Sequence, residues 1–242
     1  MKRFALLLSF LSLSAAAALL CPPADTSLVA SAQQPTPPRV ARDLSGSYRI
    51  ASSSNPGGGG SYEGKVNIAR QGGSWNLVWM IPGSVVYKGV GLQLDDTLAV
   101  GWGMGEDYGV AAYRIAAGRL DGIWTSADER GAVGAEVLEG SANLNGTYRI
   151  VKGLSANGER RYSGTVSITP KGEVYSVKWR LTQETYDGVG IRQGNLFIVG
   201  WGQAGKGAGV VAYRIAPRAL QGRWATPEDT RLGTENLVIS TQ

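Results

Sequence analysis

Residues 100–124 read VGWGMGEDYGVAAYRIAAGRLDGIW, and residues 199–224 read VGWGQAGKGAGVVAYRIAPRALQGRW. Both stretches begin with VGWG, continue through AYRIA and end on Trp. The similarity extends towards the N-terminus, where residues 44–50 (LSGSYRI) return as residues 144–150 (LNGTYRI). A repeat of about 100 residues is too long for a solenoid, whose repeats run roughly 20–50 residues. We therefore expect one domain type present twice, with a separate core in each copy.

The first copy contains eight short segments in which apolar and polar residues alternate, or nearly so. They span residues 46–51, 62–70, 74–81, 85–94, 97–103, 109–116, 120–125 and 134–139, and the second copy repeats them. Clusters of Gly, Asn, Asp and Ser separate the segments. Gly makes up 35 of the 242 residues, about twice the usual share of roughly 7%. Short alternating segments with turn residues between them are typical of β-sandwiches and β-barrels.

The tryptophans favour a closed barrel. Side chains alternate between the two faces of a strand, so Trp75, Leu77 and Trp79 share one face. The same parity places six matched tryptophans on the inward face: Trp79, Trp102, Trp124, Trp179, Trp201 and Trp224. An eight-stranded sheet with one apolar face closes into a small barrel, which removes its edges. The expected fold class is all-β, with two tandem, similar eight-stranded antiparallel up-and-down barrels.

The N-terminus is expected to be a targeting segment. Residues 1–32 combine a basic start, an apolar run and small residues up to Ala32, as in a secretory signal peptide. Residues 33–43 are Pro-rich and are expected to form a mobile leader. The chain is therefore expected to be exported, to the periplasm or out of the cell. Its single Cys, Cys21, lies inside the signal. Lipoprotein processing there is the weaker alternative, because no small residue precedes it.

The mature part is expected to be two barrel domains, residues 44–141 and residues 142–242. A single outer-membrane barrel of sixteen strands is rejected, because basic residues would face the lipid. Those residues are Lys65, Lys178, Arg180 and Arg223.

Charge is distributed unevenly between the copies. Residues 44–143 carry 7 basic and 10 acidic residues, whereas residues 144–242 carry 13 basic and 7 acidic residues. Either the surfaces drifted after duplication, or the halves attract each other, or the second half meets an acidic partner such as a polysaccharide. No basic run is interleaved with aromatic residues, so a nucleic-acid partner is not expected.

The motif Leu-x-Gly-x-aromatic occurs at residues 44–48, 120–124, 144–148 and 220–224. With eight short strands and inward tryptophans, each copy resembles the calycin-like barrels, most closely those of the avidin and streptavidin type. It is also similar to small exported bacterial proteins built on the same repeat. The resemblance implies a small closed barrel. It does not imply biotin binding, because the polar residues that hold biotin in avidins have no match in this sequence.

The inward aromatics and two glutamates are the candidate ligand-binding residues. The six matched tryptophans either fill the barrels or line an aromatic pocket at a barrel mouth. Glu136 and Glu235 keep their register in both copies and share the inward parity. A buried carboxylate needs a partner, so each glutamate either pairs structurally or contacts a ligand. Four matched arginines point outward by parity and could pair with the glutamates only at the rim or end of a barrel. They are Arg49, Arg149, Arg114 and Arg214.

The loops at residues 104–108 (MGEDY) and 203–208 (QAGKGA) differ in charge between the copies. Loops that vary on a shared scaffold are common sites of specificity, although neutral drift is the favoured explanation of the difference.

These residues predict an exported, non-enzymatic binding protein that holds a small apolar or ring-shaped ligand in aromatic barrel pockets. The alternative is a module that binds an extracellular protein or glycan through its loops. A hydrolase based on Glu136 and Glu235 is a third reading. The chain has no His, and signal cleavage would remove its only Cys, so a catalytic triad is not expected. No cofactor or metal is expected.

Overall fold

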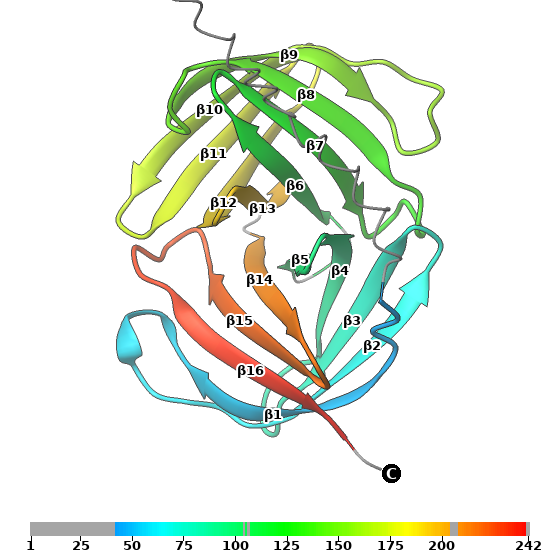
Figure 1. The fold of residues 1–242 in the computed structure, drawn as a ribbon, viewed down its shortest axis with the longest axis vertical. Helices are drawn as coiled ribbons and strands as arrows, with labels where there is room; N and C mark the ends of the chain where they lie inside the picture. The colour runs from blue at the N-terminus through cyan, green and yellow to red at the C-terminus, as the bar shows by residue number, and fades with distance from the viewer. Residues whose placement is uncertain (1–41, 104, 106, 204–207, 241–242) are drawn as a thin grey trace, which may run out of the picture. The chain divides into compact units, whose positions relative to one another are not determined.

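The computed structural model describes residues 42–103, 105, 107–203 and 208–240. These residues form sixteen strands, arranged in two closed antiparallel barrels of eight strands each (Figure 1). The predicted all-β fold with two eight-stranded barrels is therefore confirmed.

Each predicted segment corresponds to one strand, with ends shifted by at most three residues in the first copy. The strands of the first copy are β1 (Gly46–Ser54), β2 (Lys65–Gln71), β3 (Ser74–Met80), β4 (Tyr87–Leu94), β5 (Thr97–Gly103), β6 (Tyr108–Ala116), β7 (Arg119–Ser126) and β8 (Gly134–Gly140). Those of the second are β9 (Gly146–Leu154), β10 (Gly164–Lys171), β11 (Val174–Leu181), β12 (Thr185–Gln193), β13 (Leu196–Gln203), β14 (Gly209–Ala216), β15 (Ala219–Ala225) and β16 (Gly233–Ile239).

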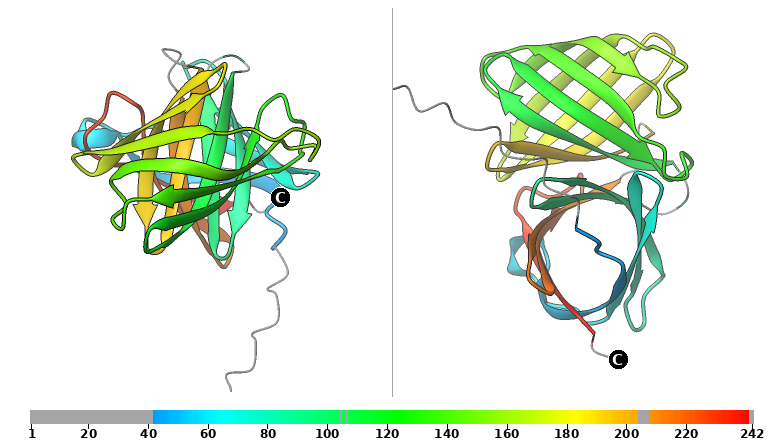
Figure 2. Two further views of the ribbon diagram at one scale, coloured as in Figure 1. Left: turned by 90° about the horizontal axis from the view of Figure 1, so that it is seen from above. Right: turned by 45° about the vertical axis from the view of Figure 1, so that its right-hand side comes forward.

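The barrels do not follow the repeats. Strands β6–β13 close one barrel, which we call the inserted barrel, through pairing of β13 with β6. Strands β1–β5 and β14–β16 close the other, which we call the split barrel, through pairing of β5 with β14. Figure 2 (right) looks into the closed ring of the split barrel. The expectation of one core per copy, in barrels of residues 44–141 and 142–242, is wrong.

The reason lies in the repeat itself. Because the two copies have equivalent strands, any eight consecutive strands contain one strand of each kind. Strands β6–β13 are such a set, and the strands that remain form a second complete set. In the split barrel, Leu98 of β5 lies opposite Tyr213 of β14. Tyr113 holds the equivalent position in β6 and lies opposite Phe197 of β13.

Inside each barrel the predicted inward residues form the core. In β3, Trp75, Leu77 and Trp79 are at most 5% exposed. The split-barrel core also contains Tyr213 and the inserted-barrel core contains Tyr113. The four matched arginines are exposed, as parity predicted: Arg49, Arg149, Arg114 and Arg214.

A third apolar core lies between the barrels. It joins the outer faces of β4, β5 and β14 to those of β6, β12 and β13, with residues such as Val90, Val110 and Ile198. Backbone hydrogen bonds add to the contact: Gly73 N donates to Gly131 O at 2.8 Å, and Glu173 N donates to Thr230 O at 2.8 Å. The sequence also predicts that the two repeats pack on each other; in the structure the contact is between the two barrels, each of which contains strands of both repeats.

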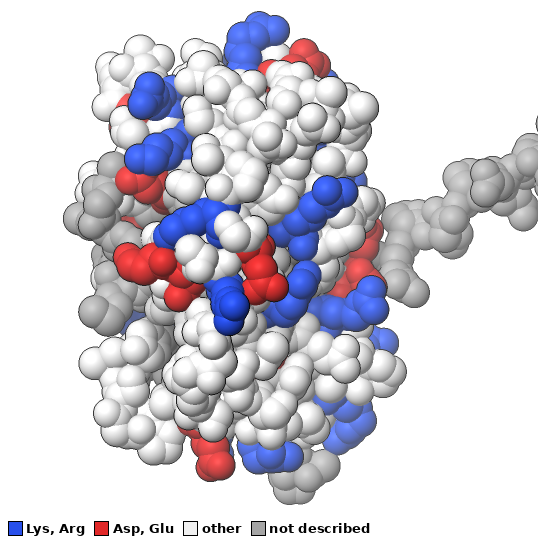
Figure 3. All heavy atoms as spheres, turned by 90° about the vertical axis from the view of Figure 1, so that its left-hand side faces the viewer, with Lys and Arg blue, Asp and Glu red and all other residues white. Residues whose placement is uncertain are grey.

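The charge difference between the copies is not a difference between the barrels. Residues 44–103 and 209–242 of the split barrel carry 8 basic and 6 acidic residues, net +2. Residues 109–203 of the inserted barrel carry 11 basic and 9 acidic residues, also net +2. On the face shown in Figure 3, basic and acidic side chains are interspersed. Net charge therefore gives the barrels no reason to attract each other, and this face offers no single-sign patch for an acidic partner.

The predicted signal peptide (residues 1–32), Cys21 within it and most of the predicted leader lie outside the described residues. At the start of the described chain, the Arg42 guanidinium donates to the carbonyl oxygen of Ala216 at 3.0 Å. Among the described residues, no helix has the length and apolar character needed to cross a membrane.

Candidate functional site

Glu235 of β16 lies inside the split barrel and is 2% exposed. Three neutral groups donate hydrogen bonds to its carboxylate. Trp79 Nε1 donates to Oε1 at 3.0 Å, and the Tyr62 hydroxyl donates to Oε2 at 2.9 Å. The Tyr213 hydroxyl donates to Oε1. The donors come from both ends of the described chain, so this cluster forms only when β14–β16 complete the barrel.

Glu136 of β8 has the same surroundings in the inserted barrel and is 3% exposed. The Tyr113 hydroxyl donates to Oε2 at 2.5 Å, and Trp179 Nε1 donates to the same oxygen at 3.2 Å. The Tyr162 hydroxyl donates to Oε1 at 3.1 Å. The two clusters therefore repeat one design, a glutamate held by two tyrosines and one tryptophan.

Burial sets the protonation of these clusters. It raises the pKa of Glu136 and Glu235 above the ordinary value of 4.5, and the hydrogen bonds from tyrosine and tryptophan oppose that rise. Burial, together with the adjacent carboxylate, raises the pKa of Tyr113 and Tyr213 well above 10.0. The tyrosines therefore keep their protons and serve as hydrogen-bond donors.

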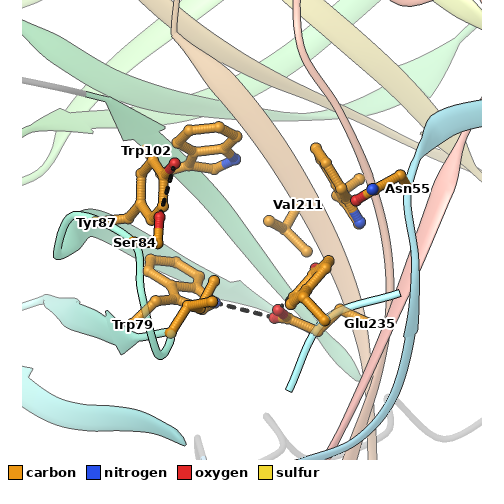
Figure 4. A pocket seen from close by; sticks show the side chains of 10 residues that line it. Asn55, Trp79, Ser84, Tyr87, Trp102, Val211 and Glu235 are labelled. Atoms are coloured by element: carbon orange, nitrogen blue, oxygen red, sulfur yellow. Dashed lines mark hydrogen bonds between the residues drawn. The ribbon is translucent and has the colours of Figure 1, made fainter. Parts of the chain in front are cut away.

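A cavity of about 240 Å³ opens above Glu235 in the split barrel. Its walls are mainly aromatic, as Figure 4 shows. The ring pairs along the walls meet at steep angles: Tyr87 with Trp102 at 83°, Trp102 with Trp224 at 64°, and Tyr62 with Trp224 at 74°. The lining residues are Asn55, Tyr62, Trp79, Ile81, Ser84, Tyr87, Trp102, Val211, Trp224 and Glu235.

The inserted barrel carries the matching aromatic residues. Tyr186 meets Trp201 at 75°, Trp201 meets Trp124 at 70°, and Trp124 meets Tyr162 at 73°. One hydrogen bond differs. Trp224 Nε1 donates to the carbonyl oxygen of Ser54 at 3.2 Å, whereas the buried Nε1 of Trp124 has no hydrogen-bond acceptor within the described part of the chain.

Glycines make room for the rings. A Cβ atom on Gly209 would lie 2.2 Å from the Trp102 ring, and one on Gly109 would lie 2.4 Å from the Trp201 ring. These contacts are too close for any side chain, so each tryptophan lies over a glycine of the neighbouring strand. Gly109 and Gly209 therefore leave the space that the two rings occupy.

The predicted site residues fall into two groups that do not follow the repeats. Trp79 and Trp102 share the split barrel with two residues of the second copy, Trp224 and Glu235. The inserted barrel holds the other four: Trp124, Trp179, Trp201 and Glu136. The suggested barrel-end pairing of the glutamates with arginines is wrong. Tyrosine and tryptophan donors hold the carboxylates instead.

Sequence reasoning missed Tyr62 and Tyr87 as lining residues. Both were visible in the repeat, since Tyr162 and Tyr186 match them. Asn55 and Ser84 lie in loops between strands, where neither parity nor the repeat predicts a position.

The loops at the two barrel mouths differ. In the split barrel, Val85 and Val86 beside the cavity are 57% and 59% exposed, which gives that mouth an apolar lip. In the inserted barrel the corresponding loop is polar, and the Tyr186 hydroxyl donates to Glu184 Oε2 at 2.6 Å. The two barrels therefore have similar aromatic residues inside, but the loops at their mouths differ in polarity.

The loops expected to carry specificity, residues 104–108 and 203–208, join the two barrels, because β5 and β14 belong to one barrel and β6 and β13 to the other. Residues 104, 106 and 204–207 of these connections lie outside the described residues.

No family model matches this chain, and neither a curated protein nor a solved structure is significantly similar to it. The resemblance to avidin-type barrels therefore stays a prediction from the sequence. Within the described ranges, no group of three or more Cys, Asp or Glu side chains is placed to hold a metal ion.

Proposed function

We propose that this protein binds a small ring-bearing or apolar ligand in the cavity of the split barrel, without carrying out chemistry on it. One observation carries the proposal: a cavity of about 240 Å³ lies beside Trp79, Trp102 and Trp224, with Glu235 at its base. A barrel filled by its own side chains would leave no such space.

The composition of the walls supports a binding role. Ligand pockets combine apolar and aromatic walls with a few placed polar groups. Here Asn55, Ser84 and Glu235 are the polar residues among mostly apolar and aromatic neighbours. The cavity lies just below the range of about 300–1,000 Å³ that drug-sized ligands use. A ligand of one or two small rings suits this size.

The glutamates favour binding over hydrolysis. Glycoside hydrolysis needs two carboxyl groups about 5–10 Å apart across one bond. Glu136 and Glu235 lie in different barrels, so they do not form such a pair. Each also accepts three hydrogen bonds from tyrosine and tryptophan. We therefore propose a non-enzymatic protein, and the signal-like residues 1–32 support export to the periplasm or the medium.

Surface binding of a protein or glycan has less support. That alternative placed the contacts on residues 104–108 and 203–208, which connect the barrels. Residues 104, 106 and 204–207 lie outside the described residues, so the structure adds no support to this alternative.

Native mass spectrometry of secreted residues 33–242 tests the proposal. Without added ligand, we expect an extra mass that is lost on denaturation, and its identity gives the ligand. Trp102→Ala should weaken retention by about 2 kcal/mol, because it removes one wall of the cavity.

The matched variant Trp201→Ala changes the equivalent wall of the inserted barrel and serves as the control. Loss in Trp102→Ala alone assigns the ligand to the split barrel. A bare mass, together with unchanged tryptophan fluorescence in the presence of extracts of the secreting culture, would count against a carrier role.

A further inference from the structure

The cavity in the split barrel is lined by one carboxyl group. Of its ten lining residues, Glu235 is the one acidic residue, and the others are aromatic, apolar or neutral polar residues. None of the ion pairs found among the described residues involves Glu235. The base of the cavity therefore holds a carboxylate without a cationic partner in the described chain.

The hydrogen bonds fit an ionised carboxylate. Trp79 Nε1 can only donate, and the hydroxyls of Tyr62 and Tyr213 point their hydrogen bonds at the same carboxylate. Oε2 receives one of these bonds and Oε1 receives two, so Oε2 keeps capacity for another donor. A buried carboxylate without a counter-ion is costly, and a bound cation would offset that cost.

The walls suit the same kind of ligand. A cation is attracted to the face of an aromatic ring within about 6 Å of its centre, most strongly for Trp. Tyr62, Tyr87, Trp79, Trp102 and Trp224 line the cavity, and neighbouring rings stand at 64° to 83° to one another. Rings at such angles form successive walls of a box. A box of this kind recognises quaternary ammonium groups in other proteins.

We infer that the cavity takes the ammonium group of a small cationic ligand, held between the aromatic walls with Glu235 as its counter-ion. The inference rests on the proposed function and adds a cationic ammonium group to the small ring-bearing or apolar ligand. The size of about 240 Å³ restricts that ligand to a compact molecule. The same carboxylate disfavours anionic ligands of similar shape.

The test uses choline and its uncharged isostere 3,3-dimethylbutan-1-ol, which differ in one atom, nitrogen against carbon. Each is titrated into secreted residues 33–242 by isothermal calorimetry. We expect choline to bind about tenfold more tightly than the isostere. Glu235→Gln should remove this preference. Glu136→Gln, the equivalent change in the inserted barrel, should leave the preference of the split barrel in place.

A second variant covers the case in which Glu235→Gln does not fold. Trp102→Leu keeps an apolar wall at a partly exposed position but removes the ring. It should weaken choline about tenfold and the isostere much less. Far-UV circular dichroism and a thermal melt confirm folding of each variant before titration.

The outcomes separate the two proposals. If the isostere binds as tightly as choline and Trp102→Leu weakens both equally, the cavity binds apolar ligands and the ammonium inference is overturned. If Glu235→Gln folds and keeps the full preference for choline, the inference is also overturned. If neither compound binds at millimolar concentration, the ammonium inference fails, and the mass spectrometry described above still decides the binding role.

Discussion

At the residue scale, Glu136 and Glu235 are the side chains that most depend on the strand arrangement. Each carboxylate points into its barrel and accepts a hydrogen bond from one tyrosine of its own copy of the repeat. It also accepts hydrogen bonds from a tyrosine and a tryptophan of the other copy. Hydrogen bonds to a charged group contribute about 1.5–3 kcal/mol each. They offset much of the cost of burying a carboxylate, and they also lock together strands from the two copies.

These glutamates predict an unusual pH dependence. Burial raises the pKa of both above 4.5 in the folded protein. The folded state therefore holds these protons more tightly than the unfolded state, so the free energy of unfolding falls as pH rises through the raised pKa values. Each pKa unit of difference corresponds to about 1.4 kcal/mol per glutamate. Urea unfolding between pH 4.5 and pH 8 measures the fall, and the chain has no His to titrate in this range.

The double variant Glu136→Gln, Glu235→Gln provides the comparison. It should unfold with a much flatter pH profile. The small remaining slope belongs to groups such as Glu129, whose pKa burial also raises. An equally steep profile in the double variant would show that these glutamates do not carry the pH dependence.

Sequence parity predicted that both glutamates face inward, and it failed to predict their partners. Parity fixes the face of a strand on which a side chain lies. It does not fix which residues lie across the barrel at the same height. Tyr62 and Tyr162 lie just before β2 and β10, at the start of the predicted segment 62–70 and its copy, and they share the parity of Val66 and Val166. Their hydrogen bonds to the glutamates became visible only with the closed barrels.

At the element scale, the repeated GWG segment is explained by two contacts. The tryptophan lies over a glycine of the next strand, while the glycine before it faces the other barrel. A Cβ atom on Gly101 would lie 1.9 Å from Gly109 O, and one on Gly200 would lie 2.1 Å from Gly209 O. The motif therefore allows β5 to pass close to β6, and β13 close to β14, where the chain crosses between barrels.

Gly101→Ala should therefore destabilise the protein by about 1–3 kcal/mol, because a methyl group must displace the backbone of β6. Gly59→Ala is the matched control. Gly59 has φ −84° and no atom within 4 Å of an added Cβ, so its change should stay below about 1 kcal/mol. Chemical denaturation midpoints of the two variants measure the difference. Equal midpoints would mean that the close approach at Gly101 is not required.

The strands themselves were predictable because their alternation is regular and their turns carry Gly, Asn or Asp. Which strands form the contact between the barrels was not predicted, although these strands left a signal. Strands β5, β6, β13 and β14 are apolar on both faces, as in the segments LAVGW and GVVAY. Strands buried on both faces show this near-continuous apolar pattern. The apolar residues on the outward face of these strands indicate that the strands lie between two cores.

At the scale of the whole molecule, the repeat determines the order of strands around a barrel but not the point at which a barrel begins. Leu98 can lie opposite Tyr113 or Tyr213 with the same side-chain contact, so local pattern cannot choose between them. Along the sequence, the inserted barrel interrupts the split barrel: β6–β13 form a continuous segment between β5 and β14. As a result, the cavity in the split barrel depends on both ends of the described chain.

This arrangement predicts which fragment folds alone. Residues 107–203 contain all eight strands of the inserted barrel, with β6 and β13 paired at its ends. We expect this fragment to unfold cooperatively in urea, and to self-associate through its uncovered face around Val110 and Ile198, because large exposed apolar patches favour association. Residues 44–141, one complete repeat, are the matched control. They also contain one strand of each kind, but their β5 must pair with β6, a pairing that the full chain lacks, so this fragment should unfold at a lower urea concentration than residues 107–203. A monomeric, cooperatively folded repeat together with an unfolded 107–203 fragment would contradict the split arrangement.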